Sequence, residues 1–275
     1  MKVLQLYQPE ERISLPKEDA WVVDLRRGVF AVADGVHLRL GIEYQGKGVE
    51  YRSAKYPNPS PAGALSQMFC NSFLKFARRE SIQKAFSSAN RSVSHFNKKR
   101  KKGETFSTAE AYYAATGAFG WIKKDALAWG NICDASVSII DKNGKMAFWQ
   151  TDHHHHNEFD PILSSYSGLD QTYMLRTVFR NALSPKGKKL GYGVITGEPA
   201  AELYVHFGKK RLRHGDLVVF ASDGFEAFFK EVSFRKALLT LDRRVIEGAI
   251  KKIQQKHSRI ANFLSERTLV AVRWD

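Results

Sequence analysis

The sequence contains only two cysteines, Cys70 and Cys133, among 275 residues. Two thiols cannot build the disulfide framework of a small secreted domain, and they lack the paired spacing of a structural zinc site. The sequence also has no run of about 18 apolar residues, and its amino terminus lacks the apolar core of a signal peptide. These absences predict a soluble, cytoplasmic protein with no membrane span.

Acidic residues are scarce relative to basic ones, since 28 Asp and Glu stand against 43 Lys and Arg, a net charge of +15. This imbalance favours anionic partners. The 84–102 region is the most basic, with seven Lys and Arg and no acidic residue. Two interpretations stay open: the region binds an acidic partner or nucleic acid, or it is a solvated helix end whose cations complement the helix dipole. The second is favoured because no aromatic residues alternate with the lysines.

Hydrophobic periodicity predicts groups of strands and pairs of helices. Strands are expected at 20–25 and 29–33 as a hairpin, between 110 and 150 with Asn143-Gly144 as a hairpin turn, at 216–221 and at 268–272. Helices are expected from Pro61 to Phe76 with Ser60 as N-cap, and over 82–96, 171–183, 234–241 and 245–256. In the 171–183 helix, Met174, Leu175, Val178, Phe179 and Ala182 form the expected buried side. Residues 41–60 are expected to form a loop.

This order of elements favours an α+β fold over a parallel doubly wound sheet, because strands and helices do not alternate strictly. No repeat and no linker interrupts the pattern. We therefore expect a single domain over residues 1–275.

Two apolar strands end abruptly at Asp-Gly, one at Asp34-Gly35 and the other at Asp223-Gly224. A carboxylate at the end of a buried strand is a rigid mount for a hard cation, and the glycine permits a turn that exposes its own carbonyl. A single Asp-Gly would indicate only a turn. The two matched strands make a metal site the more specific interpretation.

The first hairpin strengthens this prediction through its register. If Arg26 and Arg27 form its turn, Asp19 lies opposite Asp34 and Glu18 lies opposite Gly35. Three carboxylates would then meet at one end of the sheet, where they repel one another unless a divalent cation binds.

Several segments, in order, resemble the protein phosphatase 2C family of metal-dependent serine/threonine phosphatases. The matching segments are Glu18-Asp19, the strand ending at Asp34-Gly35, Ser107-Thr108-Ala109, Trp129–Ala135 with Asp134, Thr151-Asp152-His153, Leu212–Gly224 with Asp223, and Glu266–Val270. The resemblance implies a four-layer α-β-β-α sandwich with two central, mainly antiparallel sheets. It also implies that phosphorylated proteins are the substrates.

The resemblance further implies two Mg²⁺ or Mn²⁺ ions in a cleft between the sheets, and a weaker third ion. Asp34 would bridge the two ions, with Glu18 and the Gly35 carbonyl on one side and Asp223 with the last-motif carboxylate on the other. Asp19 belongs to the same cluster, and Asp134 would bind the third ion. Water activated by the two ions would attack phosphorus directly.

The sequence departs from the family pattern at four places. Ser265 occupies the position of the last aspartate ligand, and Glu266 follows it, where strand geometry would turn its side chain away unless the chain bends. Ser14 replaces the phosphate-binding arginine, so Lys17 is the candidate substitute, with Arg12 as a second. A glycine-rich segment becomes Val36–Arg39, in which His37 is a candidate proton donor and Arg39 a candidate phosphate ligand. Cys133 and Ala135 replace the glycine and serine that flank Asp134.

Two functions therefore follow from the sequence. The first is a metal-dependent phosphoprotein phosphatase. The alternative is a catalytically impaired regulatory or binding protein that keeps the phosphatase fold.

Overall fold

Two five-stranded sheets form the centre of the fold. The structure is a computed structural model, which describes residues 1–11, 15–36, 56–100, 112–152, 164–165, 171, 173–257 and 263–275. Sheet A has the order β1 (Lys2–Gln8), β10 (Arg267–Arg273), β9 (Leu217–Ala221), β6 (Ser136–Ile140) and β7 (Met146–Gln150). Sheet B has the order β2 (Ala20–Asp24), β3 (Val29–Gly35), β4 (Ala115–Lys123), β5 (Ala126–Ile132) and β8 (His206–Arg211). All of these pairings are antiparallel.

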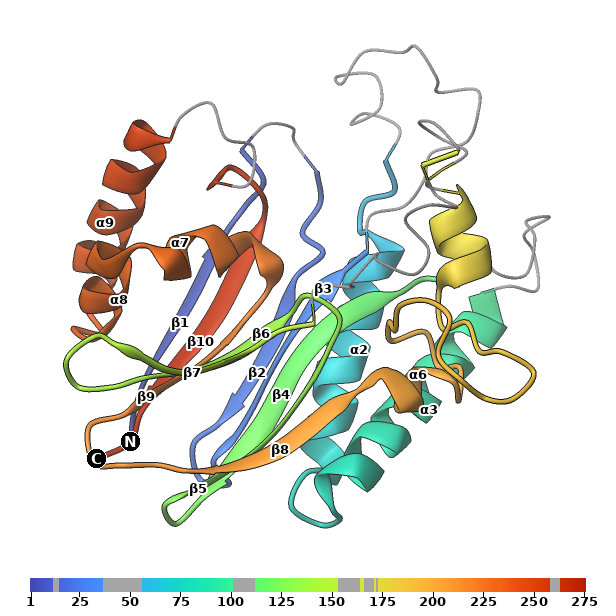
Figure 1. Ribbon diagram of the computed structural model, residues 1–275, viewed down its shortest axis with the longest axis horizontal. Coiled ribbons are helices and arrows are strands. Elements are labelled where there is room, and N and C mark those ends of the chain that lie inside the picture. Colours follow the sequence, from blue (N-terminus) through green and yellow to red (C-terminus); the bar gives the residue numbers. More distant parts are fainter. Residues whose placement is uncertain are drawn as a thin grey trace.

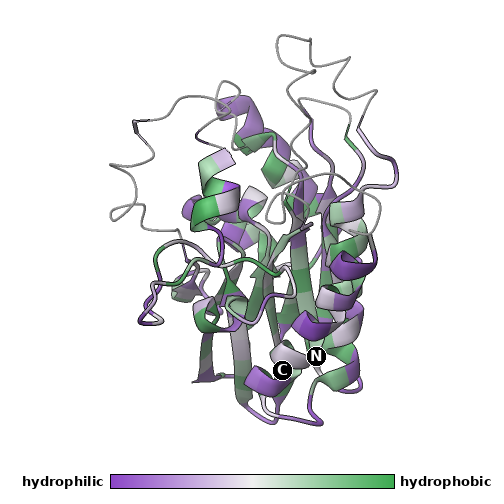
Figure 2. Cartoon of the chain, turned by 90° about the vertical axis from the view of Figure 1, so that its right-hand side faces the viewer, coloured by the Kyte–Doolittle hydropathy of each residue, from purple (hydrophilic) through white to green (hydrophobic). Residues whose placement is uncertain are grey.

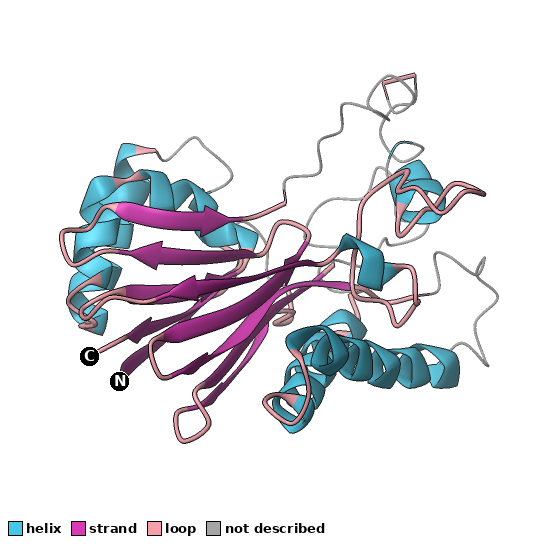
Figure 3. Cartoon of the chain, turned by 60° about the horizontal axis from the view of Figure 1, so that its bottom comes forward, coloured by secondary structure: helices cyan, strands magenta, loops and turns pink. Residues whose placement is uncertain are grey.

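Helices cover the outer face of each sheet, which gives four layers (Figures 1 and 3). Sheet B packs against α2 (Pro61–Phe76) and α3 (Ile82–Arg100), while sheet A packs against α7 (Glu226–Lys230), α8 (Val232–Leu238) and α9 (Arg243–Lys256). The short elements are α6 (Ala201–Tyr204), a π-helical turn at Leu175–Phe179 and a 3₁₀ turn at Asp223–Phe225. The predicted α+β sandwich is confirmed.

Apolar side chains fill the three interfaces between these four layers. Phe30 and Val32 of β3 meet Phe220 and Val270 between the sheets, whereas Ala31, which alternates with them, faces α2 and α3. Strands buried on both faces explain the unbroken apolar runs of the sequence. Figure 2 shows the result, with hydrophobic residues on the strands and on the inward sides of the helices.

The predicted local signals produce the expected local structures. Ala20 pairs with Ala33 and Val22 with Ala31, which is the hairpin register expected from the sequence. Ser60 caps α2, because its hydroxyl accepts hydrogen bonds from the N–H groups of Ala62 and Gly63. The turn with Gly144, whose φ is +83°, joins β6 to β7.

The predicted helix over 171–183 is wrong in its second half. The π-helical turn ends at Phe179, after which Arg180 bridges to Tyr192 and Leu183 to Lys189. Backbone pairing with a second segment replaces helical hydrogen bonds there. Val178, expected on the buried side, is 48% exposed.

Four further elements were not expected from the sequence, namely β1, β8, α6 and α7. The predicted helix at 234–241 instead spans Val232–Leu238. Cys70 is buried on α2, and Cys133 is buried in the turn after β5. Among the described residues, no helix combines the length and the hydropathy needed to cross a membrane.

Candidate metal centre

Four aspartates meet at one end of the two sheets. Asp34 is the last residue but one of β3, Asp223 and Asp134 lie two residues after the ends of β9 and β5, and Asp19 immediately precedes β2. The Asp34 carboxyl lies within hydrogen-bonding reach of the Asp19 and Asp223 carboxyls and within electrostatic reach of Asp134. The structure therefore brings together residues that are far apart in the sequence: Asp34 and Asp223 from the two Asp-Gly strands, Asp19 from the hairpin register, and Asp134 from the family resemblance.

Burial among like charges perturbs the titration of this cluster. Desolvation, followed by the charges of Asp19 and Asp223, raises the pKa of Asp34 well above its usual value. Desolvation, reinforced by the charge of Glu266, raises the pKa of Asp19 to about 7. Desolvation, reinforced by the charge of Asp134, likewise raises the pKa of Asp223 to about 7. Asp19 is buried, but Asp34 is only half-buried and Asp223 is exposed, so solvent reaches one side of the cluster.

Ser222 orients Asp19 and joins β9 to β10. Its hydroxyl accepts from the Thr268 N–H at 2.9 Å and donates to Asp19 Oδ2 at 3.0 Å. The next turn is tightly packed, because a Cβ on Gly224 would lie 2.2 Å from the Glu266 carbonyl oxygen. The position of Asp223 therefore depends on a glycine that follows it.

Two hydroxyl groups anchor Glu18. Its side chain is completely buried, and Oε1 accepts from the Tyr56 hydroxyl at 2.7 Å and from the Ser60 hydroxyl. Ser60 thus caps α2 and also donates to a carboxylate. The N-cap motif pointed to Ser60, but nothing in the sequence indicated its contact with Glu18.

Glu266 binds backbone groups of the Glu18-Asp19 segment. Its carboxylate accepts from the Glu18 N–H at 3.1 and 3.2 Å and from the Asp19 N–H at 3.3 Å. The Tyr7 hydroxyl of β1 forms a further hydrogen bond. Because Glu266 precedes β10 instead of lying in it, strand alternation does not direct its side chain. Desolvation raises the pKa of Glu266 despite these donors.

Asp134 lies on a turn held by side chains. Cys133 has φ of +65°, a left-handed conformation that favours glycine, and the Asn131 amide donates to the carbonyls of Cys133 and Ala135. The Thr151 hydroxyl donates to the Asp134 carbonyl at 3.0 Å. Asp152 is the residue after Thr151, and its Oδ2 lies 2.9 Å from Nε2 of His206 on β8. The sequence assigned no role to Asn131, although it lies in the matching Trp129–Ala135 segment, and it did not identify His206.

Of the three candidate residues for phosphate binding or proton transfer, Lys17 alone lies among the described residues. Lys17 Nζ lies over the rings of Trp21 and Tyr7, at 3.7 and 4.8 Å from their centroids. Burial lowers the pKa of Lys17, and the charge of Asp19 opposes that effect. His37 and Arg39 lie outside the described residues, as do Arg12, Ser107–Ala109 and His153.

The donor set fits a hard divalent cation. All the candidate ligands are oxygen atoms, which Mg²⁺ and Mn²⁺ prefer. Asp19 Oδ1 and Asp134 Oδ1 are buried without a hydrogen-bond partner among the described residues, as expected of atoms positioned to bind a cation. Within the same residues, no three acidic, histidine or cysteine side chains form a ready-made metal site. The carboxylates thus suit the ion in chemistry, and ligation would require them to draw closer.

The raised pKa values predict that the metal-free chain loses stability as pH rises. In the folded state the pKa of Asp19 and the pKa of Asp223 are about 7, whereas in the unfolded chain both are about 3.8. Between these values the folded state holds more protons, so the free energy of unfolding falls with increasing pH. Urea unfolding in EDTA, at about pH 5 and about pH 8, measures this fall. The free energy of unfolding should fall less with pH in Asp223→Asn than in wild type. An equal fall in wild type and in Asp223→Asn would contradict the assignment of this pH dependence to Asp223.

No family model matches the sequence, and no curated protein matches it. Solved structures do share its fold. The serine/threonine phosphatase PstP/Ppp of Mycobacterium tuberculosis superposes with a TM-score of 0.60 at 12% identity, covering 100% of this chain and 98% of that one. The serine/threonine phosphatase of S. agalactiae gives 0.58 at 16% identity, covering 100% and 99%. The PstP catalytic domain in complex with two manganese ions gives 0.56 at 13%, covering 98% of each chain. At these identities the likeness establishes the fold over the whole chain.

Proposed function

Since the chain has the protein phosphatase 2C-like fold, we propose that it is a metal-dependent phosphatase acting on phosphoserine or phosphothreonine in proteins. The convergence of Asp19, Asp34, Asp134 and Asp223 carries this proposal. Four carboxylates that repel one another at the open end of a rigid sandwich destabilise the chain unless they bind a cation. The basic surface attracts phosphorylated substrates.

Asp34, Asp223 and the Gly35 carbonyl are the groups that would hold two divalent ions, with Asp134 available to a weaker third. When bound, such ions lower the pKa of water and neutralise phosphoryl oxygens. The chain's own residues set the geometry: Ser222 fixes the orientation of Asp19, while Glu266 fixes the backbone of Glu18 and Asp19. His37 is proposed to protonate the leaving serine oxygen, and Lys17 or Arg39 to bind the phosphate.

A catalytically impaired binding protein is the second candidate, favoured by the contacts of Glu266 and Glu18. Both carboxylates accept hydrogen bonds from the protein itself, and Ser265 occupies the position of the aspartate ligand that the family pattern places there. Each bond that a carboxylate makes to a backbone N–H or hydroxyl has to be broken or shared before it binds an ion. A loss of metal affinity would follow.

Phosphate release from a phosphothreonine peptide tests the proposal. The EDTA-treated chain is assayed without metal, with Mg²⁺ and with Mn²⁺, beside Asp223→Asn and the control Glu247→Gln on α9. We expect turnover only with metal, its loss in Asp223→Asn, and no change in Glu247→Gln, because that side chain pairs with Arg243 on the surface.

The outcomes separate the two candidates. No turnover together with weak or no metal binding by calorimetry would favour the impaired binding protein. Turnover that is the same in EDTA, or that survives in Asp223→Asn, would exclude the proposed site as its source.

A further inference from the structure

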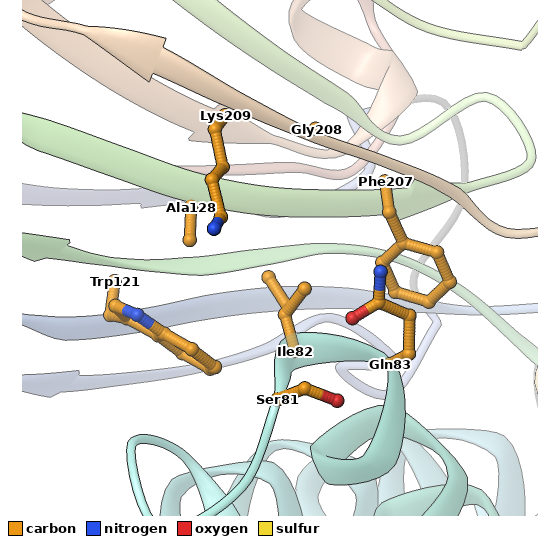
Figure 4. A pocket seen from close by; sticks show the side chains of 8 residues that line it. All are labelled: Ser81, Ile82, Gln83, Trp121, Ala128, Phe207, Gly208 and Lys209. Carbon is orange, nitrogen blue, oxygen red and sulfur yellow. The ribbon is translucent and has the colours of Figure 1, made fainter.

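A second concavity lies on the outer face of sheet B, away from the carboxylates. This outer-face cavity has a volume of about 530 Å³ and is formed by the start of α3 and by β4, β5 and β8; Figure 4 shows its lining. Trp121 lies in the cavity and Thr116, which pairs with Asp34, lies five residues away on β4. That separation is about 17 Å along the strand.

Most of the lining is apolar. Trp121, Ala128 and Phe207 form the side of the sheet, and Ile82 forms the side of α3. Trp121 is stacked on Phe73, and Phe207 meets Phe119 edge to face, so both rings are held in place. The volume lies within the range of small-ligand pockets, and rigid aromatic walls suit a bulky apolar group.

Positive charge borders this apolar lining on one side. Trp121 pairs with Ala128 and Ala128 with Lys209, so these three residues form one row across the sheet. The next row on the same face is Lys123, Ala126 and Arg211. Lys123, Lys209 and Arg211 are all exposed, and only Arg211 forms an ion pair with another described residue, Asp125. An exposed pair of this kind is weak and leaves Arg211 available.

The start of α3 adds to the positive potential. The first turn of this helix contains no acidic residue. The Ser81 hydroxyl accepts a hydrogen bond from the Lys84 N–H group, and the Ser81 carbonyl accepts one from the Ala85 N–H group. Helix geometry leaves the N–H groups of Ile82 and Gln83 without a partner inside the helix, which favours a negative charge nearby.

We propose that the outer-face cavity binds an acidic peptide segment of a partner protein. A bulky apolar side chain fills the space beside Trp121 and Phe207, and an acidic side chain two residues away contacts Lys123 and Arg211. A small ligand inside the cavity would reach only Lys209, because the row of Lys123 and Arg211 lies about 7 Å farther along the strands. Alternate side chains of an extended peptide have this same spacing. The surface therefore recognises an apolar residue, any residue and then an acidic one.

Fluorescence anisotropy with a labelled peptide that contains two phenylalanine-serine-glutamate repeats tests this inference. The protein variants are Lys209→Glu, the cavity-filling Ala128→Leu, and Lys252→Glu, an equal charge change on the exposed face of α9. We expect Ala128→Leu, which fills the space for the apolar side chain, to weaken binding by about tenfold or more. Lys209→Glu places a negative charge beside that space and next to the row of Lys123 and Arg211, so it should weaken binding by a similar factor, whereas Lys252→Glu should leave binding unchanged within about twofold. Peptides with serine for phenylalanine or glutamine for glutamate should also bind at least about tenfold more weakly.

The inference does not depend on the phosphatase proposal, since binding is measured without turnover. No binding by the repeat peptide would overturn it. Equal losses in Lys209→Glu and Lys252→Glu, or equal binding of the serine peptide, would show diffuse charge attraction and would also overturn it. A single-stranded oligonucleotide that binds more tightly than the peptide, with the same dependence on Lys209, would assign the surface to nucleic acid instead.

Discussion

Asparagine in place of Asp34 is expected to reduce metal-dependent phosphate release by about a thousandfold or more, since several kcal/mol of transition-state stabilisation depend on a bound cation. Asp34 is at the centre of the cluster, because the charges of Asp19, Asp223 and Asp134 all act on it. An amide retains the size of the side chain but removes the charge that attracts the ions. Initial rates at saturating Mn²⁺, measured with wild type and Asp34→Asn, provide the comparison.

The same substitution should stabilise the metal-free chain, which distinguishes a lost ligand from a lost fold. Asp34→Asn removes one of several clustered like charges, so the free energy of unfolding in EDTA at about pH 8 should rise by about 1 kcal/mol or more. Added Mn²⁺ should then stabilise wild type and not the variant. Reduced activity together with reduced stability in EDTA would instead indicate a structural role for Asp34.

Arg267→Ala is expected to cause the largest loss of stability of any substitution considered, about 3–5 kcal/mol. The guanidinium is completely buried at the start of β10. It donates to Gln8 and Glu11 at 2.6 Å each, and to the carbonyls of Phe263 and Ser265 at 2.7 and 3.2 Å. Alanine would take these donors from the two carbonyls and leave Gln8 and Glu11 without their guanidinium partner, and it would remove the contact with Phe228.

Urea unfolding of Arg267→Ala, Arg267→Lys and Arg243→Ala measures this effect. Lysine cannot reproduce the planar set of donors, so Arg267→Lys should lose most of the same free energy. Arg243 lies on the surface of α9 and pairs only with Glu247 among the described residues, so its removal should cost less than about 0.5 kcal/mol. Wild-type stability in Arg267→Lys would mean that the charge alone matters.

The sequence predicted that Asp19 and Asp34 lie together, because local rules determine this contact. Alternation of side chains along a strand and a short turn set the hairpin register, which brings Asp19 to Asp34. The strand that ends at Asp223-Gly224 resembles the strand that ends at Asp34-Gly35, and this resemblance predicted that Asp223 belongs to the same cluster. Ser60 and Asn143-Gly144 were equally local signals, and both proved correct.

Other features depend on contacts between distant segments, which a single sequence does not reveal. The exposed strand β8, with its lysines and arginine, carries no apolar alternation, because only pairing with β5 makes it a strand. The contacts of Glu266 with the Glu18 and Asp19 backbone arise from how the start of β10 packs, not from periodicity. The 171–183 segment has helical spacing, but pairing of Arg180 with Tyr192 overrides it.

The topology of sheet A constrains the order in which the chain can fold. β10 lies between β1 and β9, so Lys2 pairs with Arg273 and the first strand has no neighbour until the last one arrives. Leu4 and Leu6 of β1 cannot be covered by β10 until that strand has been made, although both are buried in the finished sheet. Contacts this distant in sequence slow folding and prolong the interval in which an unpaired strand can associate with other chains. We therefore expect a late, cooperative closure of the sandwich, and newly made chains that benefit from a chaperone holding β1 until β10 emerges.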